Sequence, residues 1–189
     1  MSSFAALFDA CVLYPAPLRD LLVSVAQTGL FRARWTDEIH DEWIRNVLND
    51  RKDLKPDQLK RTRELLNQAV PDCLISGHQA LIPALTLPDE SDRHVLAAAI
   101  VGRATVIVTY NLKDFPDEAL KPYGIHAEHP DQFFSNQFDL DPPKVASQVR
   151  ALRARLKNPP QTVEQLLDTY LKAGLPETVA KLRTMADLL

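Results

Sequence analysis

The stretch from residue 88 to residue 116, PDESDRHVLAAAIVGRATVIVTYNLKDFP, constrains the fold more than any other part of the chain. Asp89 and Asp92 suit a helix N-terminus, where carboxylates meet unpaired N–H groups and the positive end of the helix dipole. Apolar residues at helical spacing follow in residues 95–100. Residues 104–108 are uncharged and rich in β-branched side chains, which is typical of a strand covered on both faces. The stretch therefore predicts a helix followed by a strand of a parallel sheet.

Polar residues come directly after this predicted strand, namely Thr109, Asn111 and Asp114. The preceding helix runs antiparallel to the strands, so it begins at the sheet edge where the strands end. Open α/β sheets place their functional sites at that edge. We therefore expect Asp92 and Asp114 to meet there.

The rest of the chain repeats the β-α pattern with short connections, which favours a doubly wound α/β fold. The predicted strands are residues 4–8, 30–35, 72–75 and 124–127, and the predicted helices are residues 17–28, 37–49, 56–69 and 130–136. A boundary is expected at Asp141-Pro142-Pro143, after which only helices are predicted, at residues 144–157, 162–173 and 176–188. We thus expect one domain over residues 1–139 and a helical C-terminal extension over residues 140–189 that packs on it.

Composition narrows the class of protein. The chain has 189 residues, 46% of them hydrophobic and 25% charged, as in an ordinary globular protein. No apolar run reaches membrane-spanning length and the start lacks a basic region, so an unprocessed cytoplasmic protein without a membrane segment is expected. The net charge of −3 argues against general polyanion binding but permits a nuclease with an acidic, cation-binding pocket. Cys11 and Cys73 are expected to be reduced, buried thiols.

Four acidic residues are predicted to converge. Asp9 ends the first strand, Glu42 lies in the helix after the second, and Asp92 and Asp114 flank the strand at 104–108. The first strand and this one become neighbours if the strand order reverses between them. Two carboxylates about 4 Å apart repel by roughly 4 kcal/mol at an effective dielectric constant near 20. A divalent cation relieves such repulsion, and Mg²⁺ prefers carboxylates and waters.

Simpler interpretations exist for each residue. An aspartate after a buried strand is often only a turn or capping residue, and Asp89 is expected to cap rather than to ligate. Arg93 either binds a scissile phosphate or pairs with Asp89 or another nearby acid. His94 is expected to be a hydrogen-bonded structural residue rather than a general base. Arg19 points from the first helix toward the same edge, where it could bind substrate, although a solvated side chain is favoured.

A basic helical face is predicted in the C-terminal extension, where Arg150 and Arg153 lie with Lys157. This face could follow an RNA backbone, but basic helical faces are more often only solvated. Apolar stripes on the last two predicted helices are expected to pack on the body of the protein, and they leave dimer or partner contact open.

Other α/β families fit less well. A haloacid-dehalogenase-type phosphatase needs a second acid two residues after Asp9, where this chain has Cys11. A receiver domain needs an adjacent acidic pair in the first turn, which is missing. The five glycines do not cluster, which excludes P-loop and dinucleotide-binding fingerprints.

The sequence resembles the PIN domain in several blocks: residues 8–13 (FDACVL), the helix with Glu42 and Trp43, Asp89-x-x-Asp92 followed by residues 93–99, and residues 107–116 (IVTYNLKDFP). The likeness covers roughly residues 4–136 and is greatest to bacterial PIN proteins related to VapC-type toxins. It implies a three-layer α/β/α sandwich around a short parallel sheet.

The resemblance also implies a site. Asp9, Glu42, Asp92 and Asp114 match the four acidic positions, with Asp9, Asp92 and Asp114 as metal ligands, and Thr109 and Asn111 match the polar positions that hold the last acid and the metal waters. Glu38 and Asp41 lie near the Glu42 position, and Glu42 is preferred because Ile39 and Trp43 define the buried stripe beside it.

The implied function is a Mg²⁺- or Mn²⁺-dependent endoribonuclease acting on single-stranded RNA, as the toxin of a toxin–antitoxin pair with a cognate antitoxin as partner. A homodimer is left open. The alternative is a PIN-like scaffold that binds RNA or protein without cutting it.

Overall fold

The structure, a computed structural model, describes residues 4–189. Its centre is a four-stranded parallel sheet in the order β2-β1-β3-β4. The strands are β1 (Ala5–Phe8), β2 (Arg32–Arg34), β3 (Val106–Val108) and β4 (His126–Glu128). Leu7 of β1 lies opposite Ile107 of β3, so the strand order reverses between these two central strands as expected. This reversal is what brings the end of β1 next to the end of β3.

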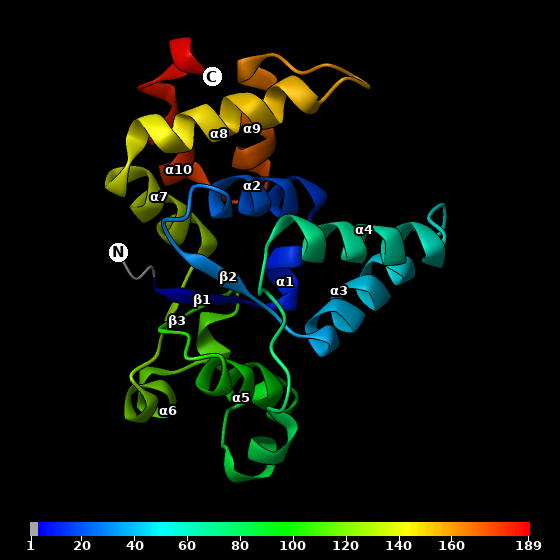
Figure 1. The fold of residues 1–189 in the computed structure, drawn as a ribbon, viewed down its shortest axis with the longest axis vertical. Helices are drawn as coiled ribbons and strands as arrows, with labels where there is room; N and C mark the ends of the chain where they lie inside the picture. The colour runs from blue at the N-terminus through cyan, green and yellow to red at the C-terminus, as the bar shows by residue number, and fades with distance from the viewer. Residues whose placement is uncertain (1–3) are drawn as a thin grey trace.

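Helices cover both faces of the sheet, and the expected α/β/α sandwich is confirmed (Figure 1). The helices are α1 (Ala10–Leu13), α2 (Ala16–Ala26), α3 (Asp37–Asp50), α4 (Pro56–Ala69), α5 (Arg93–Val101), α6 (Asp117–Leu120), α7 (Pro130–Leu140), α8 (Pro142–Arg155), α9 (Val163–Lys172) and α10 (Pro176–Arg183). Short 3-10 helices are η1 (Gln79–Ala84), η2 (Glu90–Asp92), η3 (Leu112–Asp114), η4 (Lys121–Tyr123) and η5 (Ala186–Leu188).

The two faces of the sheet are packed by different side chains. Helix α5 carries an apolar, alanine-rich stripe that lies against β1 and β3. On the other face, Phe133 of α7 packs edge-on against Phe8, 5.3 Å away, and against Phe31, 4.9 Å away between ring centroids. Buried apolar side chains on both faces explain why β1 and β3 read as continuous hydrophobic runs.

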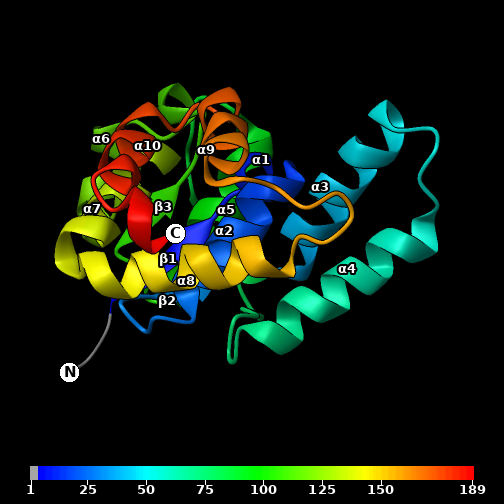
Figure 2. The same cartoon turned by 90° about the horizontal axis from the view of Figure 1, so that it is seen from above.

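Helices α8, α9 and α10 form a further layer outside the sandwich (Figures 1 and 2). Helix α8 packs on α2 and α7, and α10 packs on α7 and α9. The apolar stripes of these helices contribute Leu167, Tyr170 and Leu182 to the core, all fully buried. The division into residues 1–139 and 140–189 stays a prediction, and residues 1–3 of its first part lie outside the described residues.

Some predicted elements differ from the structure. The strand expected at residues 72–75 is reduced to a single bridge between Trp35 and Leu74. Asp72 adopts a φ of 57°, which breaks an extended run. The last helix ends at Arg183 rather than 188, followed by η5. Helix α1 was not predicted because four residues are too few to show a helical period.

Helices α3 and α4 form a hairpin that extends away from the body (Figure 2). Both cysteines are free, with Cys73 buried and Cys11 only partly buried. Within residues 4–189, none of the helices has the combination of length and hydrophobicity that crossing a bilayer requires.

Candidate active site

Asp9 lies at the centre of the acidic edge, directly after β1, and is 4% exposed. Its Oδ1 accepts a hydrogen bond from the Ala10 N–H at 2.7 Å, so Asp9 caps helix α1, a role the sequence did not predict. Its Oδ2 accepts from the Thr109 hydroxyl at 2.7 Å and from the Cys11 thiol at 3.2 Å. Burial raises the pKa of Asp9 and the charge of Glu42 adds to the rise, while the hydrogen bonds from Thr109 and Cys11 oppose it.

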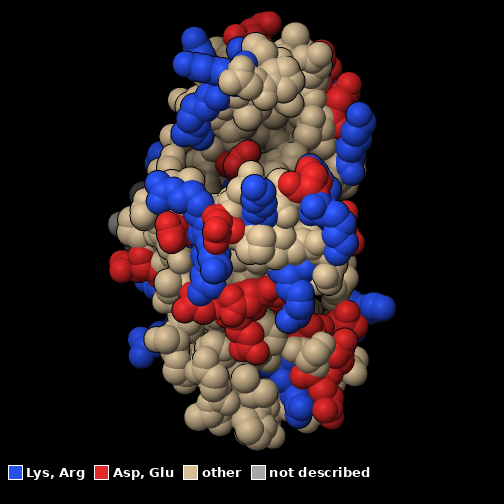
Figure 3. Space-filling view, turned by 90° about the vertical axis from the view of Figure 1, so that its right-hand side faces the viewer, with Lys and Arg blue, Asp and Glu red and all other residues tan. Residues whose placement is uncertain are grey.

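The charges of the other predicted acids reach Asp92, which ends η2 and is the N-cap residue of α5. Burial, followed by the charges of Asp9, Asp89, Asp114 and Glu42, raises the pKa of Asp92 to about 6. Four carboxylates therefore act on one side chain, as expected if they share one edge of the sheet. Figure 3 views the face toward which the strands' carboxyl ends point, and acidic side chains gather in its lower half with Lys and Arg around them.

Glu42 reaches this edge from α3 and contacts a histidine of α5. Its Oε2 lies 3.5 Å from Nε2 of His94, whose Nδ1 lies 3.7 Å from Oε2 of Glu38. Burial lowers the pKa of His94, but the interactions with Glu42 and Glu38 outweigh it, so the pKa lies above its ordinary value. His94 thus lies between two glutamates one helical turn apart, within ion-pair distance of both, although its Nδ1 has no hydrogen-bond partner among the described residues.

The two other acids near Glu42 on α3, Glu38 and Asp41, contact residues outside the acidic edge. The Glu38 carboxylate also faces the buried His78, 3.4 Å away. Asp41 is exposed and pairs with Arg63 of α4 at 2.8 Å. Of the three acids on this part of α3, only Glu42 is among the charges that raise the pKa values of Asp9 and Asp92. The choice of Glu42 as the site residue stays a prediction, and these charge interactions support it.

Thr109 and Asn111 follow β3, and their placement differs in part from expectation. The buried Thr109 hydroxyl donates to Asp9, the first acid, rather than to Asp114, the last. It also accepts from the Asn111 N–H at 3.0 Å. Asn111 is exposed, and its carbonyl accepts from the Asp114 N–H at 3.0 Å. The loop thus connects the last acid to the first through backbone and hydroxyl contacts.

Asp89 and Arg93 have the simpler of the two roles considered for each: Asp89 is a capping residue and Arg93 forms an ion pair. Asp89 accepts from the N–H of Ser91 at 2.8 Å and from its hydroxyl at 2.7 Å, so it caps η2 as expected. Arg93 pairs with Glu90 at 3.1 Å, an acid one turn earlier. Its guanidinium is therefore engaged in a surface ion pair at the rim of the site.

Arg19 is buried, and the expectation of a solvated side chain is wrong. Its guanidinium donates to the carbonyl oxygens of Leu13 and Tyr14, which end α1, and lies 4.4 Å from the ring centroid of Trp43. Helix ends leave unpaired carbonyls that need donors, and this arginine supplies them. It therefore joins α1, which follows Asp9, to α3, which carries Glu42.

The basic face predicted on α8 is only partly available. Arg150 is exposed. Arg153 is partly buried and donates to the backbone oxygens of Leu189 and Gln161, each at 3.2 Å. These two bonds give Arg153 a structural role in the C-terminal layer.

The donor set of the acidic edge fits a hard divalent cation in its chemistry. All four groups are carboxylates, and within residues 4–189 no Lys or Arg lies within ion-pair distance of Asp9, Asp92 or Asp114. Among the same described residues, no three His, Cys, Asp or Glu side chains lie close enough to ligate one ion together. Mg²⁺ usually keeps several waters and needs only one or two direct carboxylates, so this spacing is compatible with it.

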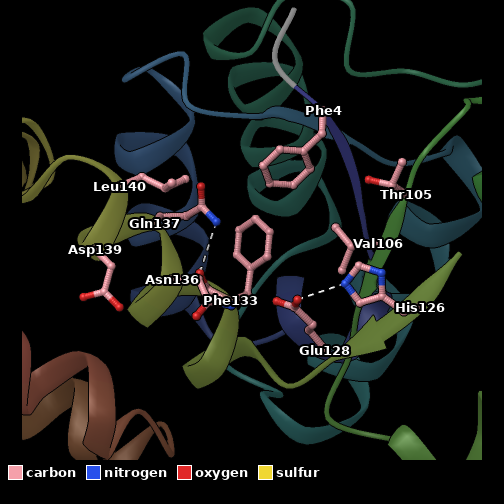
Figure 4. A pocket seen from close by; sticks show the side chains of 10 residues that line it. All are labelled: Phe4, Thr105, Val106, His126, Glu128, Phe133, Asn136, Gln137, Asp139 and Leu140. Atoms are coloured by element: carbon pink, nitrogen blue, oxygen red, sulfur yellow. Dashed lines mark hydrogen bonds and ion pairs between the residues drawn. The ribbon is translucent and has the colours of Figure 1, made fainter.

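A cavity of about 450 Å³ lies at the opposite edge of the sheet, near the start of β3 (Figure 4). Its lining includes Phe4, Val106 and Phe133. His126 and Glu128 also line it, with 2.9 Å between His126 Nε2 and Glu128 Oε1. None of the predicted site residues lines it. We place the candidate site at the acidic edge because several buried or partly buried carboxylates act on one another there.

Sequence reasoning missed two residues of this edge. Cys11 lies between Asp9 and Thr109, with Sγ 3.4 Å from the Thr109 Oγ1, and its thiol pKa is raised to about 12, chiefly by burial. Tyr110 lies inside the polar loop after β3 and contacts the C-terminal layer. Cys11 could have been found from its place two residues after Asp9, whereas nothing in the sequence signals the partner of Tyr110.

Comparison with known proteins gives two family matches. Residues 5–113 match the model of the PIN domain, and residues 130–184 match that of the VapC50 C-terminal domain. The chain is 45% identical over 109 residues to the Mycobacterium tuberculosis (strain ATCC 25618 / H37Rv) protein named "Putative ribonuclease VapC50". The aligned segment covers 58% of this chain and 63% of that relative, so it spans less than two thirds of the relative's length. No solved structure matches the chain.

Proposed function

Because the chain belongs to the PIN-domain family, we propose that it is a Mg²⁺- or Mn²⁺-dependent endoribonuclease that hydrolyses phosphodiester bonds of single-stranded RNA. The observation that carries the proposal is the meeting of Asp9, which follows β1, with the loop that follows the neighbouring strand β3, where the Thr109 hydroxyl donates to Asp9 at 2.7 Å. Burial, followed by the charges of Asp9, Asp89, Asp114 and Glu42, raises the pKa of Asp92 beside it. Carboxylates that repel one another at the carboxyl edge of a parallel sheet are suited to hold a divalent cation. The match to a protein named as a ribonuclease supports the same class of reaction.

Each side chain has a proposed role. Asp9, Asp92 and Asp114 would hold the cation directly or through water, and Thr109 fixes the Asp9 carboxylate by its hydrogen bond of 2.7 Å. A bound divalent cation supplies charge stabilisation at the phosphate and makes water more acidic. Glu42 orients the attacking water, and His94 holds Glu42 from α5. Water attacks phosphorus in line, the bond to the 3′ oxygen breaks, and the products carry a 5′-phosphate and a 3′-hydroxyl.

The Asp9→Asn variant tests this assignment. We expect Mn²⁺-dependent cleavage of RNA to be lost, because the amide removes a negative ligand, while the fold survives because the amide oxygen can still accept from Ala10 or Thr109. Cleavage of a panel of tRNA and mRNA fragments, with and without chelator, and circular dichroism are the measurements. Asp53→Asn, which alters an exposed aspartate paired with Arg51 on the α3–α4 connection, is the control and should cleave as the wild type does. Wild-type rates in Asp9→Asn would refute the assignment.

The alternative is a PIN-like scaffold that binds RNA or protein without turnover. It is favoured by the spacing of the acids, since no three His, Cys, Asp or Glu side chains of residues 4–189 come within ligating distance of one point. The two functions differ in one measurement: a scaffold retains RNA in a binding assay at millimolar Mn²⁺ and releases no shorter products.

The biological role that we propose is that of the toxin in a toxin–antitoxin pair, with a cognate antitoxin as partner. The similarity to a VapC-named protein and the match to the VapC50 C-terminal domain support this role. A small neighbouring reading frame that encodes a DNA-binding N-terminus would be the genetic sign of the antitoxin. Co-expression with that frame should restore growth to cells that are arrested by this chain, and analytical ultracentrifugation should reveal whether the chain is a homodimer.

A further inference from the structure

The loop after β3 is held by two residues that directly follow β1, Asp9 and Cys11. The Thr109 hydroxyl donates to Asp9 at 2.7 Å, and the Tyr110 N–H donates to Sγ of Cys11 at 3.4 Å. These contacts connect residues 109–111 to the acid that we place at the centre of the site. Any movement of the loop would therefore move a hydrogen-bond donor of Asp9.

The side chain of Tyr110 makes a contact in the C-terminal layer. Its hydroxyl donates to the carbonyl oxygen of Ala173 at 2.6 Å, at the C-terminal end of α9. The carbonyls at a helix C-terminus lack intrahelical partners and carry partial negative charge, so they are good acceptors for a hydroxyl. The ring also packs edge-on against His129, with 4.9 Å between centroids.

The turn that accepts this hydrogen bond is itself fixed. Gly174 has a φ of 80°, which suits glycine, and a Cβ there would lie 3.7 Å from the Tyr110 ring. The Leu175 N–H donates to the Tyr170 carbonyl at 3.1 Å and closes the turn. Helix α10, which follows the turn, is capped by the buried Asp131 of α7, whose carboxylate accepts from the N–H groups of Glu177 at 2.9 Å and Thr178 at 2.8 Å.

We propose that the C-terminal helices control the geometry of the acidic site through Tyr110. The turn between α9 and α10 fixes Tyr110, Tyr110 fixes the loop after β3, and this loop keeps the Thr109 hydroxyl on Asp9. Tyr110 is thus a positioning residue, and the C-terminal layer is a structural part of the active site. The inference rests on the proposed function only where it concerns catalysis, because the mechanical link can be measured without RNA or metal.

The test compares Tyr110→Phe with Tyr14→Phe. Each variant removes one tyrosine hydroxyl. The Tyr14 hydroxyl donates to the carboxylate of the exposed Asp50 at 2.5 Å, rather than to a residue of the C-terminal layer. Amide hydrogen exchange of residues 109–114 in metal-free protein should be roughly 3- to 10-fold faster in Tyr110→Phe, since a single hydrogen bond is lost. In Tyr14→Phe the exchange of this segment should equal that of the wild type. Equal exchange in Tyr110→Phe and wild type would overturn the link.

Cleavage kinetics then test the route through Thr109. With Mn²⁺ and RNA, kcat should fall by roughly 3- to 10-fold in Tyr110→Phe with KM unchanged, because a catalytic acid is misplaced while RNA contacts remain. In a Thr109→Val background, Tyr110→Phe should cause no further fall in kcat. The same fold-change in both backgrounds would exclude the route through Thr109. If the wild type itself does not cleave RNA, the proposed function fails, and hydrogen exchange alone decides the link.

Discussion

At the level of single residues, Asp92 differs most clearly from an ordinary surface aspartate, because its pKa is raised. A carboxyl group whose pKa is about 6, where 3.8 is usual, keeps its proton in the folded protein at pH values where the unfolded chain has lost it. Ionising it then costs stability. The metal-free protein should therefore lose stability from this group as pH rises from about 4 to about 6, and the loss should persist at higher pH.

The Asp92→Asn variant should reverse this effect, because asparagine has no charge that burial would desolvate and none to repel Asp9, Asp114 or Glu42. Without metal, we expect a higher melting temperature than wild type at pH 7, and a smaller fall between about pH 4 and about pH 7. Differential scanning fluorimetry across pH is the measurement. Asp53→Asn is the control, since the hydrogen bond from Arg51 lowers the pKa of that exposed aspartate and its removal should give no gain at pH 7. A lower melting temperature of Asp92→Asn at pH 7 would argue against repulsion at the site.

At the level of secondary-structure elements, α7 and α10 are joined by two acids of very different exposure. Asp131 is 6% exposed and caps the N-terminus of α10, whereas Asp139 is exposed and pairs with Lys181. We expect Asp131→Ala to lower the free energy of unfolding by about 1–3 kcal/mol, because two buried N–H groups lose their acceptor. Asp139→Ala should lower it by at most about 1 kcal/mol, as is usual for surface ion pairs. Urea unfolding measures both, and equal losses would contradict the capping role.

The elements show what sequence patterns can and cannot predict. The strand at 106–108 and the helix at 93–101 were foreseen within a few residues, because a buried parallel strand and a capped helix have strong local signals. The strand predicted at 72–75 failed, since only Leu74 pairs with Trp35 in a single bridge and Asp72, at the start of the predicted strand, has a positive φ. Helix α1 escaped prediction because it owes its existence to the Asp9 cap and to Arg19 at its other end. Both are tertiary or capping contacts, which a search for helical periodicity does not detect.

At the level of the whole molecule, cation binding should be visible as added stability. A ligand that binds only the folded state at about 100 times its dissociation constant stabilises it by about 2.7 kcal/mol. We therefore expect millimolar Mg²⁺ to raise the melting temperature of the wild type, with chelator restoring the lower value. In Asp9→Asn or Asp114→Asn, the metal-free protein should be as stable as the wild type or more so, and Mg²⁺ should add little. The absence of any shift in the wild type would favour the scaffold alternative.

The part of the predicted site that follows β1 and β3 could be placed from the sequence because it depends on strand order. Once β1 and β3 are neighbours in a parallel sheet, residues that follow them must lie at the same edge. The contacts between this edge and the C-terminal layer were not predictable. Tyr110 meets Ala173, 63 positions later, and Asp131 meets Glu177, 46 positions later, through packing that leaves no periodic trace. The positions of the acids in the sequence indicated which chemistry to expect. The contacts that hold the loop after β3 in place are tertiary and could not be predicted.

The acceptor for Tyr110 is a main-chain carbonyl, and this has a consequence for protein engineering. Any amino acid at position 173 that keeps the helix ending there presents the same carbonyl oxygen. Substitutions at position 173 should therefore leave the exchange of residues 109–114 unchanged, whereas substitutions at position 110 should alter it. A chimaera that carries these terminal helices from another PIN-domain protein would need to reproduce the placement of one peptide group, whatever side chains surround it.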